Sequence, residues 1–256
     1  MWIVLLVKLL TPPLLTIPVV LPWLHLSHVL TQQLLITWAS GTCLMTLIFI
    51  RQIIRFRQIL ATRSLIDATA TRELEEIGQR LGVSKAPQLR LFDGRVSPLL
   101  WGWGLRNAIV FPRSLWERLS LQERRSLLTH ELGHHIRGDH YVRMLEIVCM
   151  CVYWWHPVVW CARYRIEEAE ETCCDAFVVR HEPSRTYANA IMATLDFISE
   201  SPCKTVTYAS QLAPASLQKR LTAVMLRSQS ERLSRIGWLT LFVFCLLLLP
   251  LHPVFL

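Results

Sequence analysis

The sequence predicts a mainly α-helical membrane protein with a small β-sheet and a metal site on one of its helices. Residues 130–134 read His-Glu-Leu-Gly-His, a spacing that places two imidazoles on one helix face. Three long apolar stretches can each reach across a bilayer. With 52% hydrophobic residues and a mean hydropathy of +0.34, the 256-residue chain is too apolar for an ordinary soluble domain.

The apolar stretches cover residues 1–23, 30–50 and 236–256. They predict an N-terminal transmembrane region of about two helices within residues 1–57 and a C-terminal transmembrane helix over the last stretch. The first stretch contains Lys8 and four prolines, which favour a kinked or partly re-entrant helix. A cleaved signal peptide is the alternative. We expect a retained anchor, because no basic segment precedes the apolar run and no small-residue cleavage site follows it.

Positive charge beside the spans predicts their orientation. Four arginines follow the second stretch and five basic residues precede the third, so both flanks are expected on the cytoplasmic side. Residues 58–235 then form a cytoplasmic domain, and the basic rim beside anionic lipid accounts for part of the net charge of +8. No motif for direct DNA or RNA binding accompanies this charge. The flanking residues are Arg51, Arg55, Arg57 and Arg63, and Lys219, Arg220, Arg227, Arg232 and Arg235.

One helix and two strands are expected ahead of the histidine motif. Residues 65–81 have helical periodicity with charged residues on one face, and residues 87–92 and 107–111 are short strands. Turn residues lie around the strands at 93–94 and 102–104. An exposed strand edge close to the motif can pair with the backbone of an extended peptide.

The helix that carries the motif has clear boundaries in the sequence. Ser120 begins a capping box, leucines supply an apolar stripe, and Gly138 marks the end. His130 and His134 are separated by one turn and about 40° of rotation, so both imidazoles can reach one ion. His135 is rotated by about 140° from the first histidine, and we do not expect it to be a ligand.

The pattern H-E-x-x-H on a helix is typical of zinc metallopeptidases, in which two histidines bind zinc and the glutamate, here Glu131, activates water. The same letters also arise by chance on amphipathic helices with satisfied surface histidines, so the surrounding sequence decides between the two interpretations. A catalytic zinc needs a third protein ligand and an open position for water. We expect that ligand on a second helix downstream.

An acidic run at residues 165–175 supplies candidates for the third ligand. Glu171 and Asp175 lie one turn apart, so the first carboxylate can bind zinc while the second holds a ligand histidine through its other ring nitrogen. Glu170 and Glu167 are the competing candidates. Without the upstream motif, a solvated helix face balanced by nearby arginines would be the better interpretation.

Residues 141–160 form another apolar stretch, interrupted by Arg143 and Glu146. A single crossing here would leave the expected ligands on opposite sides of the membrane. A double crossing would need about 40 apolar residues, more than lie between His140 and Arg163. We therefore expect a helix that is buried in the domain core or lies along the membrane surface with its tryptophans at the interface.

The eight cysteines contain no C-x-x-C pair and lie mostly in apolar helical surroundings, so no disulfide framework is expected. Cys173 and Cys174 lie close to Glu171 in the sequence. We expect small buried packing residues there, with a thiolate ligand or a redox switch as the alternative.

Four motifs, in their order and spacing, resemble the BlaR/MecR-type integral-membrane zinc metallopeptidases of bacteria. The resemblance is densest between about residue 97 and residue 179. The matching segments are residues 97–112, residues 130–134 followed by Asp139, residues 153–160, and residues 171–175.

By this resemblance, the domain between the membrane helices has a zincin-like fold of the gluzincin type. It implies that His130, His134 and Glu171 hold one Zn²⁺ per chain, with the third ligand at 171 rather than 170. Asp139 and Asp175 are then acids that support the ligands or the local structure.

The mechanism expected for this class is metal-assisted hydrolysis, in which Glu131 takes a proton from the bound water and later passes it to the leaving amine. A further donor to the oxyanion is expected. The candidates, which follow the second helix, are Tyr187, Arg185 and His181.

The resemblance also implies a protein of the bacterial inner membrane that cleaves a cytoplasmic repressor, a partner or itself at a specific site. The chain ends at Leu256, without the large sensor domain of antibiotic-sensing relatives. We therefore expect a separate sensor protein, sensing by the loop around residues 25–33, or a role in membrane-protein turnover. The alternative is a non-hydrolytic signal transducer organised by zinc. Glu131 argues against it, because a structural zinc site needs no base beside its ligands.

Overall fold

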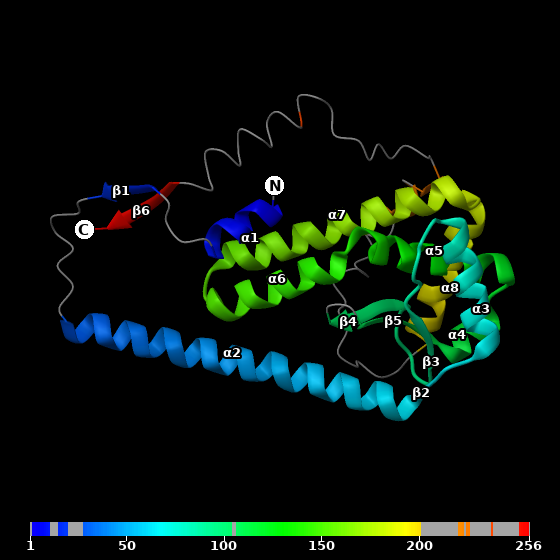
Figure 1. The fold of residues 1–256 in the computed structure, drawn as a ribbon, viewed down its shortest axis with the longest axis horizontal. Coiled ribbons are helices and arrows are strands. Elements are labelled where there is room, and N and C mark those ends of the chain that lie inside the picture. Colours follow the sequence, from blue (N-terminus) through cyan, green and yellow to red (C-terminus); the bar gives the residue numbers. More distant parts are fainter. Residues whose placement is uncertain are drawn as a thin grey trace. The chain divides into compact units, whose positions relative to one another are not determined.

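The computed structural model describes residues 2–10, 15–19, 28–103, 106–200, 220–222, 224–225, 237 and 251–255. These residues are mainly helical with a small sheet, as predicted, and a second pair of short strands (Figure 1). The chain forms two compact units. The hairpin unit contains Met1–Arg55, Val142–Ile166 and Arg232–Leu256, and the sheet unit contains Phe56–Tyr141 and Glu167–Glu231.

The long helix α2 (His28–Arg63) contains the second predicted span. Its 36 residues correspond to a length of about 54 Å, nearly twice the thickness of the hydrocarbon core of a bilayer. Within the described residues it is the one helix long and apolar enough to cross a membrane, and its most apolar window is not buried in the protein. Length and composition therefore support a span over residues 30–50.

The first predicted span is helical over a shorter distance than expected. The helix α1 (Trp2–Leu10) covers only the beginning of residues 1–23, and the strand β1 (Leu15–Val19) follows it. Pro18 lies inside this strand. Proline disfavours a helix at this position, because it has no backbone N–H to donate a helical hydrogen bond.

The third predicted span falls largely outside the described residues. Its last part, Leu251–Phe255, forms the strand β6 where a helix was predicted. Pro253 in the middle of the segment disfavours a helix for the same reason. β6 pairs in parallel with β1, with Leu15 opposite Leu251.

The apolar stretch 141–160 is not one helix. The helices α6 (Asp139–Val152) and α7 (Pro157–His181) are joined by a turn at residues 153–156. Proline at the first position of α7 explains the break, because its missing N–H is tolerated at a helix start but not in a helix interior. α6 and the first part of α7 run side by side as a helical hairpin (Figure 1). Its buried residues are Cys149, Met150, Val159, Ala162 and Ile166, joined by Leu6 of α1.

The sheet unit contains a four-stranded sheet in the order β2-β3-β5-β4. The strands β3 (Gln88–Phe92) and β5 (Arg106–Pro112) were predicted, and they pair in parallel. The edge strands β2 (Ser64–Leu65) and β4 (Leu99–Trp103) were not predicted. Of the turn expected at residues 102–104, Gly102 and Trp103 belong to β4, where Gly102 pairs with Asn107, and Gly104 lies outside the described residues.

Four helices of the sheet unit share one hydrophobic core with the strands. The helices α3 (Ala68–Arg80), α4 (Arg113–Arg118), α5 (Leu121–Arg137) and α8 (Ser184–Ser199) contribute to it. The side chain of Asp67 caps α3 by accepting hydrogen bonds from two backbone N–H groups of its first turn. Fully buried members of the core include Leu74, Ile77, Leu89, Ile109, Phe111, Leu128, Leu132 and Tyr187. This core fixes α5 against α8 and against β4, which positions the histidine motif.

Candidate metal centre

The helix α5 has the boundaries that the sequence predicted. The Ser120 hydroxyl accepts a hydrogen bond from the Glu123 N–H, and the Glu123 carboxylate accepts one from the Ser120 N–H at 2.9 Å. Gly138 ends the helix in the left-handed region, at φ 74°. Both ends are therefore defined locally, and the histidine motif lies in the last two turns, in the buried part of the helix.

Three ligand-type atoms converge beside α5. Nε2 of His130 lies 3.2 Å from Nε2 of His134. The Glu171 carboxylate on α7 lies 3.5 Å from each of these nitrogens, through Oε2 and Oε1 respectively. Ligand atoms around a tetrahedral zinc at about 2.1 Å are separated by roughly 3.4 Å. The spacing therefore fits a small cation held by these three side chains.

The competing residues do not join this cluster. His135 points elsewhere on α5, as its rotation predicted, and lies against His140 with ring centroids 6.2 Å apart. Glu170 and Glu167 are buried on α7, and among the described residues neither belongs to a group that could hold a metal ion. The structure thus brings Glu171, and not its neighbours, to the two histidines.

Asp139 supports the second histidine directly. Its Oδ2 lies 2.7 Å from Nδ1 of His134, so the ring donates there and leaves Nε2 free to face the cluster. Arg137 approaches the other oxygen of Asp139 at 3.4 Å. Burial opposes a charge on His134, but hydrogen bonds to Asp139, Cys174 and Glu171 outweigh it and hold its pKa well above the ordinary value.

Asp175 supports the first histidine through an intermediary that the sequence analysis did not foresee. The Tyr187 hydroxyl lies 2.8 Å from Nδ1 of His130 and donates to Oδ1 of Asp175 at 2.6 Å. The direct distance from Asp175 to His130 is 3.5 Å. Because the hydroxyl hydrogen is committed to the carboxylate, the hydroxyl oxygen accepts from Nδ1–H, and Nε2 of His130 is free for a metal.

This contact corrects one expectation. Tyr187 was a candidate for an oxyanion donor, but its hydroxyl lies on the Nδ1 side of His130, away from the nitrogen that faces Glu171. Of the other two candidates, His181 pairs through Nδ1 with the Phe177 carbonyl and Arg185 is exposed on α8. The structure gives none of the three a contact with the ligand cluster that supports an oxyanion role.

Arg220 is a site residue that sequence reasoning did not identify as one. Its positive charge was counted in the basic flank of the C-terminal span. In the structure its guanidinium makes a fork with Asp175, at 2.8 Å to each oxygen, and lies 3.0 Å from Oε2 of Glu171. The neighbouring Val224 is fully buried in the core of the sheet unit. The apolar residues after Arg220 were the available signal for a docked helical turn.

Electrostatics of the centre also fit a divalent cation. The cluster contains four carboxylates, which are Glu131, Asp139, Glu171 and Asp175, and two arginines at residues 137 and 220. Two negative charges therefore remain when all six groups are ionised and the histidines are neutral. Burial raises the pKa of Glu171, but Arg220 and the two histidines outweigh it, so that this pKa lies well below its usual value.

Glu131 lies between α5 and the edge of the sheet. The side chain is buried, with 6% of the residue exposed, and this burial raises the pKa of its carboxyl group. The backbone N–H of Leu100 in β4 donates a hydrogen bond to this carboxylate, which lowers its pKa and partly offsets the effect of burial. Since β4 is an edge strand of the sheet, the carboxylate lies beside an edge with which no other described strand pairs.

The described cysteines are free thiols. Cys174 is fully buried, packs against Gly133, and forms a side-chain hydrogen bond with His134. Burial raises its pKa, which favours the neutral thiol. Together with His134 and Asp139 it forms a second group of ligand-type atoms, but the neutral thiol matches the expected role of a packing residue.

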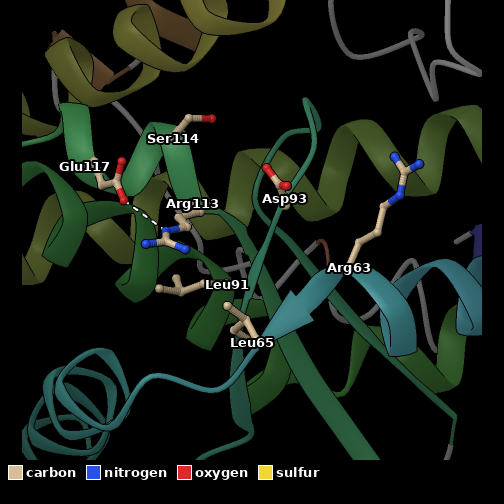
Figure 2. A pocket seen from close by; sticks show the side chains of 7 residues that line it. All are labelled: Arg63, Leu65, Leu91, Asp93, Arg113, Ser114 and Glu117. Carbon is tan, nitrogen blue, oxygen red and sulfur yellow. Dashed lines mark hydrogen bonds and ion pairs between the residues drawn. The ribbon is translucent and has the colours of Figure 1, made fainter.

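The sheet unit also contains a hollow (Figure 2). It has a volume of about 370 Å³ and lies at the β2 edge of the sheet, with Arg63, Asp93, Arg113 and Glu117 among its lining residues. Arg113 and Glu117 point toward each other and form an ion pair at 3.0 Å (Figure 2). None of the residues of the metal centre lines it.

Comparison with known proteins agrees with the chemistry of this centre. Residues 22–224 match the family model described as BlaR1 peptidase M56. The chain belongs to this BlaR1 peptidase family, which confirms its BlaR/MecR-type resemblance. The family consists of metallopeptidases.

The chain is also similar to named relatives over part of their length. It is 23% identical, over 176 residues, to the methicillin resistance mecR1 proteins of Staphylococcus aureus and Staphylococcus epidermidis. The aligned part is 64% of this chain and 28% of each relative. The similarity and the apolar helix α2 together indicate a membrane protein.

Proposed function

We propose that the protein is a membrane-embedded zinc metalloendopeptidase that carries out regulated, site-specific proteolysis in signal transduction. The observation that carries the proposal is the convergence of His130, His134 and Glu171 beside the buried carboxylate of Glu131. Membership of a peptidase family supports the same chemistry.

The donor set suits zinc, since two imidazoles and one carboxylate leave an open fourth position. Zn²⁺ bound there would polarise the scissile carbonyl and lower the pKa of a bound water. The chain's own residues prepare the site for it. Asp139 and the Tyr187 hydroxyl hold Nδ1 of the two histidines, so each presents Nε2.

Glu131 is the proposed general base. Its carboxyl group is buried, and a pKa raised by burial brings a carboxylate closer to the range in which it can accept and return a proton near neutral pH. The carboxylate would take a proton from water and pass it to the leaving amine. The Leu100 N–H holds the carboxylate in place during these transfers.

The edge strand β4 is the proposed substrate platform. Its inner edge pairs with β5, and the other edge is open in the order of the sheet. An extended peptide can add to such an edge through backbone hydrogen bonds, with little dependence on side-chain identity. The contact between Leu100 and Glu131 places this edge next to the proposed base.

We further propose that the sheet unit faces the cytoplasm of a bacterial cell and that a cytoplasmic repressor, a partner or the peptidase itself is cleaved. The arginines at the C-terminal end of α2 support this orientation. The chain spans about a quarter of the length of the mecR1 relatives. A separate sensor protein is one proposed source of the signal.

The proposal is tested by trapping the substrate in cells. Cells would carry the wild-type chain, Glu131→Gln, or the matched control Glu75→Gln, which changes an exposed glutamate on α3. We expect a protein that co-purifies with Glu131→Gln and appears as two fragments with the wild type and the control. A non-hydrolytic transducer would instead give the same partners, intact, with all three chains.

A further inference from the structure

The tip of the α6–α7 hairpin has the composition of a membrane-embedded segment. Residues 147–162 contain no Asp, Glu, Lys or Arg, and they hold three of the chain's ten tryptophans, at residues 154, 155 and 160, together with Tyr153. The hairpin belongs to the same compact unit as the first 28 residues of α2, which include the apolar span. The hairpin therefore shares a unit with the apolar part of α2, the helix that supports membrane insertion.

The tip contacts the middle of that span. The indole Nε1 of Trp38 donates to the carbonyl of Val152 at 2.9 Å. The Trp154 ring lies so close to Gly41 that no Cβ would fit there without a shift. Trp38 and Gly41 lie near the centre of the apolar stretch 30–50, so the tip is level with the middle of the span.

A second contact fixes the direction of the hairpin along α2. Phe49 packs against the cluster that contains Cys149, Met150 and Val159. α6 therefore runs antiparallel to α2, from the basic end of the span toward its centre. From Val142 to the tip, α6 rises about 15 Å, which is half the thickness of the hydrocarbon core.

Several polar groups of the turn at the tip have hydrogen-bond partners within the protein. The Trp160 indole donates to the Trp154 carbonyl at 3.0 Å. Nδ1 of His156 accepts from the Val158 N–H at 3.2 Å, and the His156 N–H donates to the Tyr153 carbonyl at 2.9 Å. An irregular backbone is tolerated at membrane depth only where such partners exist.

The charged side chains of the hairpin lie outside residues 147–162. Arg163 on the second arm extends toward the first arm and donates to Sδ of Met150 at 3.3 Å. Arg143, next to the base, pairs at 3.2 Å with Glu146, whose side chain is 1% exposed. Arg165, at the other base position, lies over the Tyr164 ring. The large side chains left exposed on the two arms and the turn are Val148, Trp155, Val158, Trp160 and Tyr164.

We propose that the α6–α7 hairpin is a re-entrant membrane element, which enters the bilayer beside α2 from its arginine-rich end and turns near the midplane. The partner of its exposed surface is the lipid acyl chains. The inference rests on the proposed insertion of α2. A single membrane crossing over residues 141–160 would separate the expected metal ligands. A re-entrant hairpin returns both arms to the same side of the membrane, so Asp139 at the start of α6 and Glu171 in α7 can lie on that side together.

The proposal is tested on the wild-type full chain reconstituted in vesicles of phosphatidylcholine and phosphatidylglycerol. Part of the lipid would carry a photoreactive diazirine, either at the end of the acyl chain or close to the headgroup. Adducts would be mapped by mass spectrometry. Leu121 and Ile136, exposed apolar residues of the sheet unit, are the matched controls for reaction outside lipid.

We expect the chain-end probe to label Trp155 and Val158 as strongly as residues 36–44 of α2, at least tenfold above Leu121 and Ile136. The headgroup probe should favour residues near the base of the hairpin. Labelling of α2 without labelling of the hairpin would overturn the re-entrant hairpin alone. Labelling of neither would overturn the proposed membrane insertion and this inference with it, while leaving peptidase chemistry to its own test.

Discussion

The Tyr187 hydroxyl lies 2.8 Å from Nδ1 of His130, and this contact sets which nitrogen of the ring is free for a metal. The same hydroxyl donates to Asp175, whose other contacts are with Arg220. A chain of hydrogen bonds thus extends from the first histidine to a residue 90 positions away in the sequence. Supporting contacts of this kind orient a metal ligand as well as stabilise the fold.

Tyr187→Phe removes the hydroxyl and keeps the ring in the core. Nδ1 of His130 then loses its acceptor, and the ring is free to present either nitrogen. We expect zinc affinity to fall roughly 10-fold or more. Competition with a fluorescent chelator measures it, with Tyr164→Phe, an exposed tyrosine, as control. Equal affinities for the two variants would show that Tyr187 serves packing alone.

Arg220→Gln removes the cation between two buried carboxylates. Because Asp175 and Glu171 would then be left without their charged partner, we expect the protein to lose about 3 kcal/mol of stability, or roughly 6–10 °C in Tm. Thermal unfolding in detergent measures the change. Arg118→Gln is the control, because its partner Glu200 is about half exposed and the loss should be below about 1 kcal/mol.

The double variant Arg220→Gln with Asp175→Asn separates the ion pair from simple packing. Neutralising Asp175 removes most of the unpaired negative charge, so the arginine substitution should lower Tm much less in this background. Additive losses in the two backgrounds would contradict the role given to this pair.

Zinc binding should depend on pH through His134. Zinc binds the neutral ring, and the pKa of His134 without metal lies well above its ordinary value of 6.5, so a proton competes with zinc at neutral pH. Apparent affinity should therefore rise with pH through neutrality, with a limiting slope of about tenfold per pH unit for the loss of one proton. Asp139→Asn removes a group that raises this pKa and should flatten the rise above neutrality. Chelator competition across this range tests both, and a flat wild-type profile would contradict the assignment.

The sequence predicted the parts of the site that follow from local rules. The spacing of His130 and His134, the capping box at Ser120 and the stop at Gly138 all depend on contacts within one helix, and the structure has them. The spacing of the acidic residues on α7 did not decide whether Glu171, Glu170 or Glu167 is the third ligand. Only the packing of α7 shows which of them faces the histidines.

What the sequence could not predict depends on contacts between distant segments. The pairing of β4 with β5 overrides the turn preference of Gly102. In the sequence, Arg220 is one of several basic residues that precede an apolar stretch. Only the packing of its short helical turn brings it to Glu171. The break before Pro157 was visible in the sequence, but hydrophobicity alone made residues 141–160 resemble one helix.

Gly138 is required by the backbone at the end of α5. At φ 74° an alanine adopts a strained conformation, and its Cβ would meet the Tyr141 ring at 3.3 Å. We expect Gly138→Ala to destabilise the sheet unit by about 1–2 kcal/mol. Gly78→Ala, inside α3 with room for a Cβ, should be neutral or stabilising by up to about 1 kcal/mol. Thermal unfolding of the two variants compares them directly, and equal losses would contradict the backbone argument.

The central claim is that this centre holds zinc and that Glu131 is the base for peptide hydrolysis. The most direct test measures zinc content and cleavage on the same samples, with purified wild type and Glu131→Gln in lipid vesicles and a library of extended peptides. We expect about one zinc per chain in both proteins, and cleavage products from the wild type alone that are lost on chelation. Zinc in both proteins with identical peptide profiles would contradict it and leave zinc with an organising role.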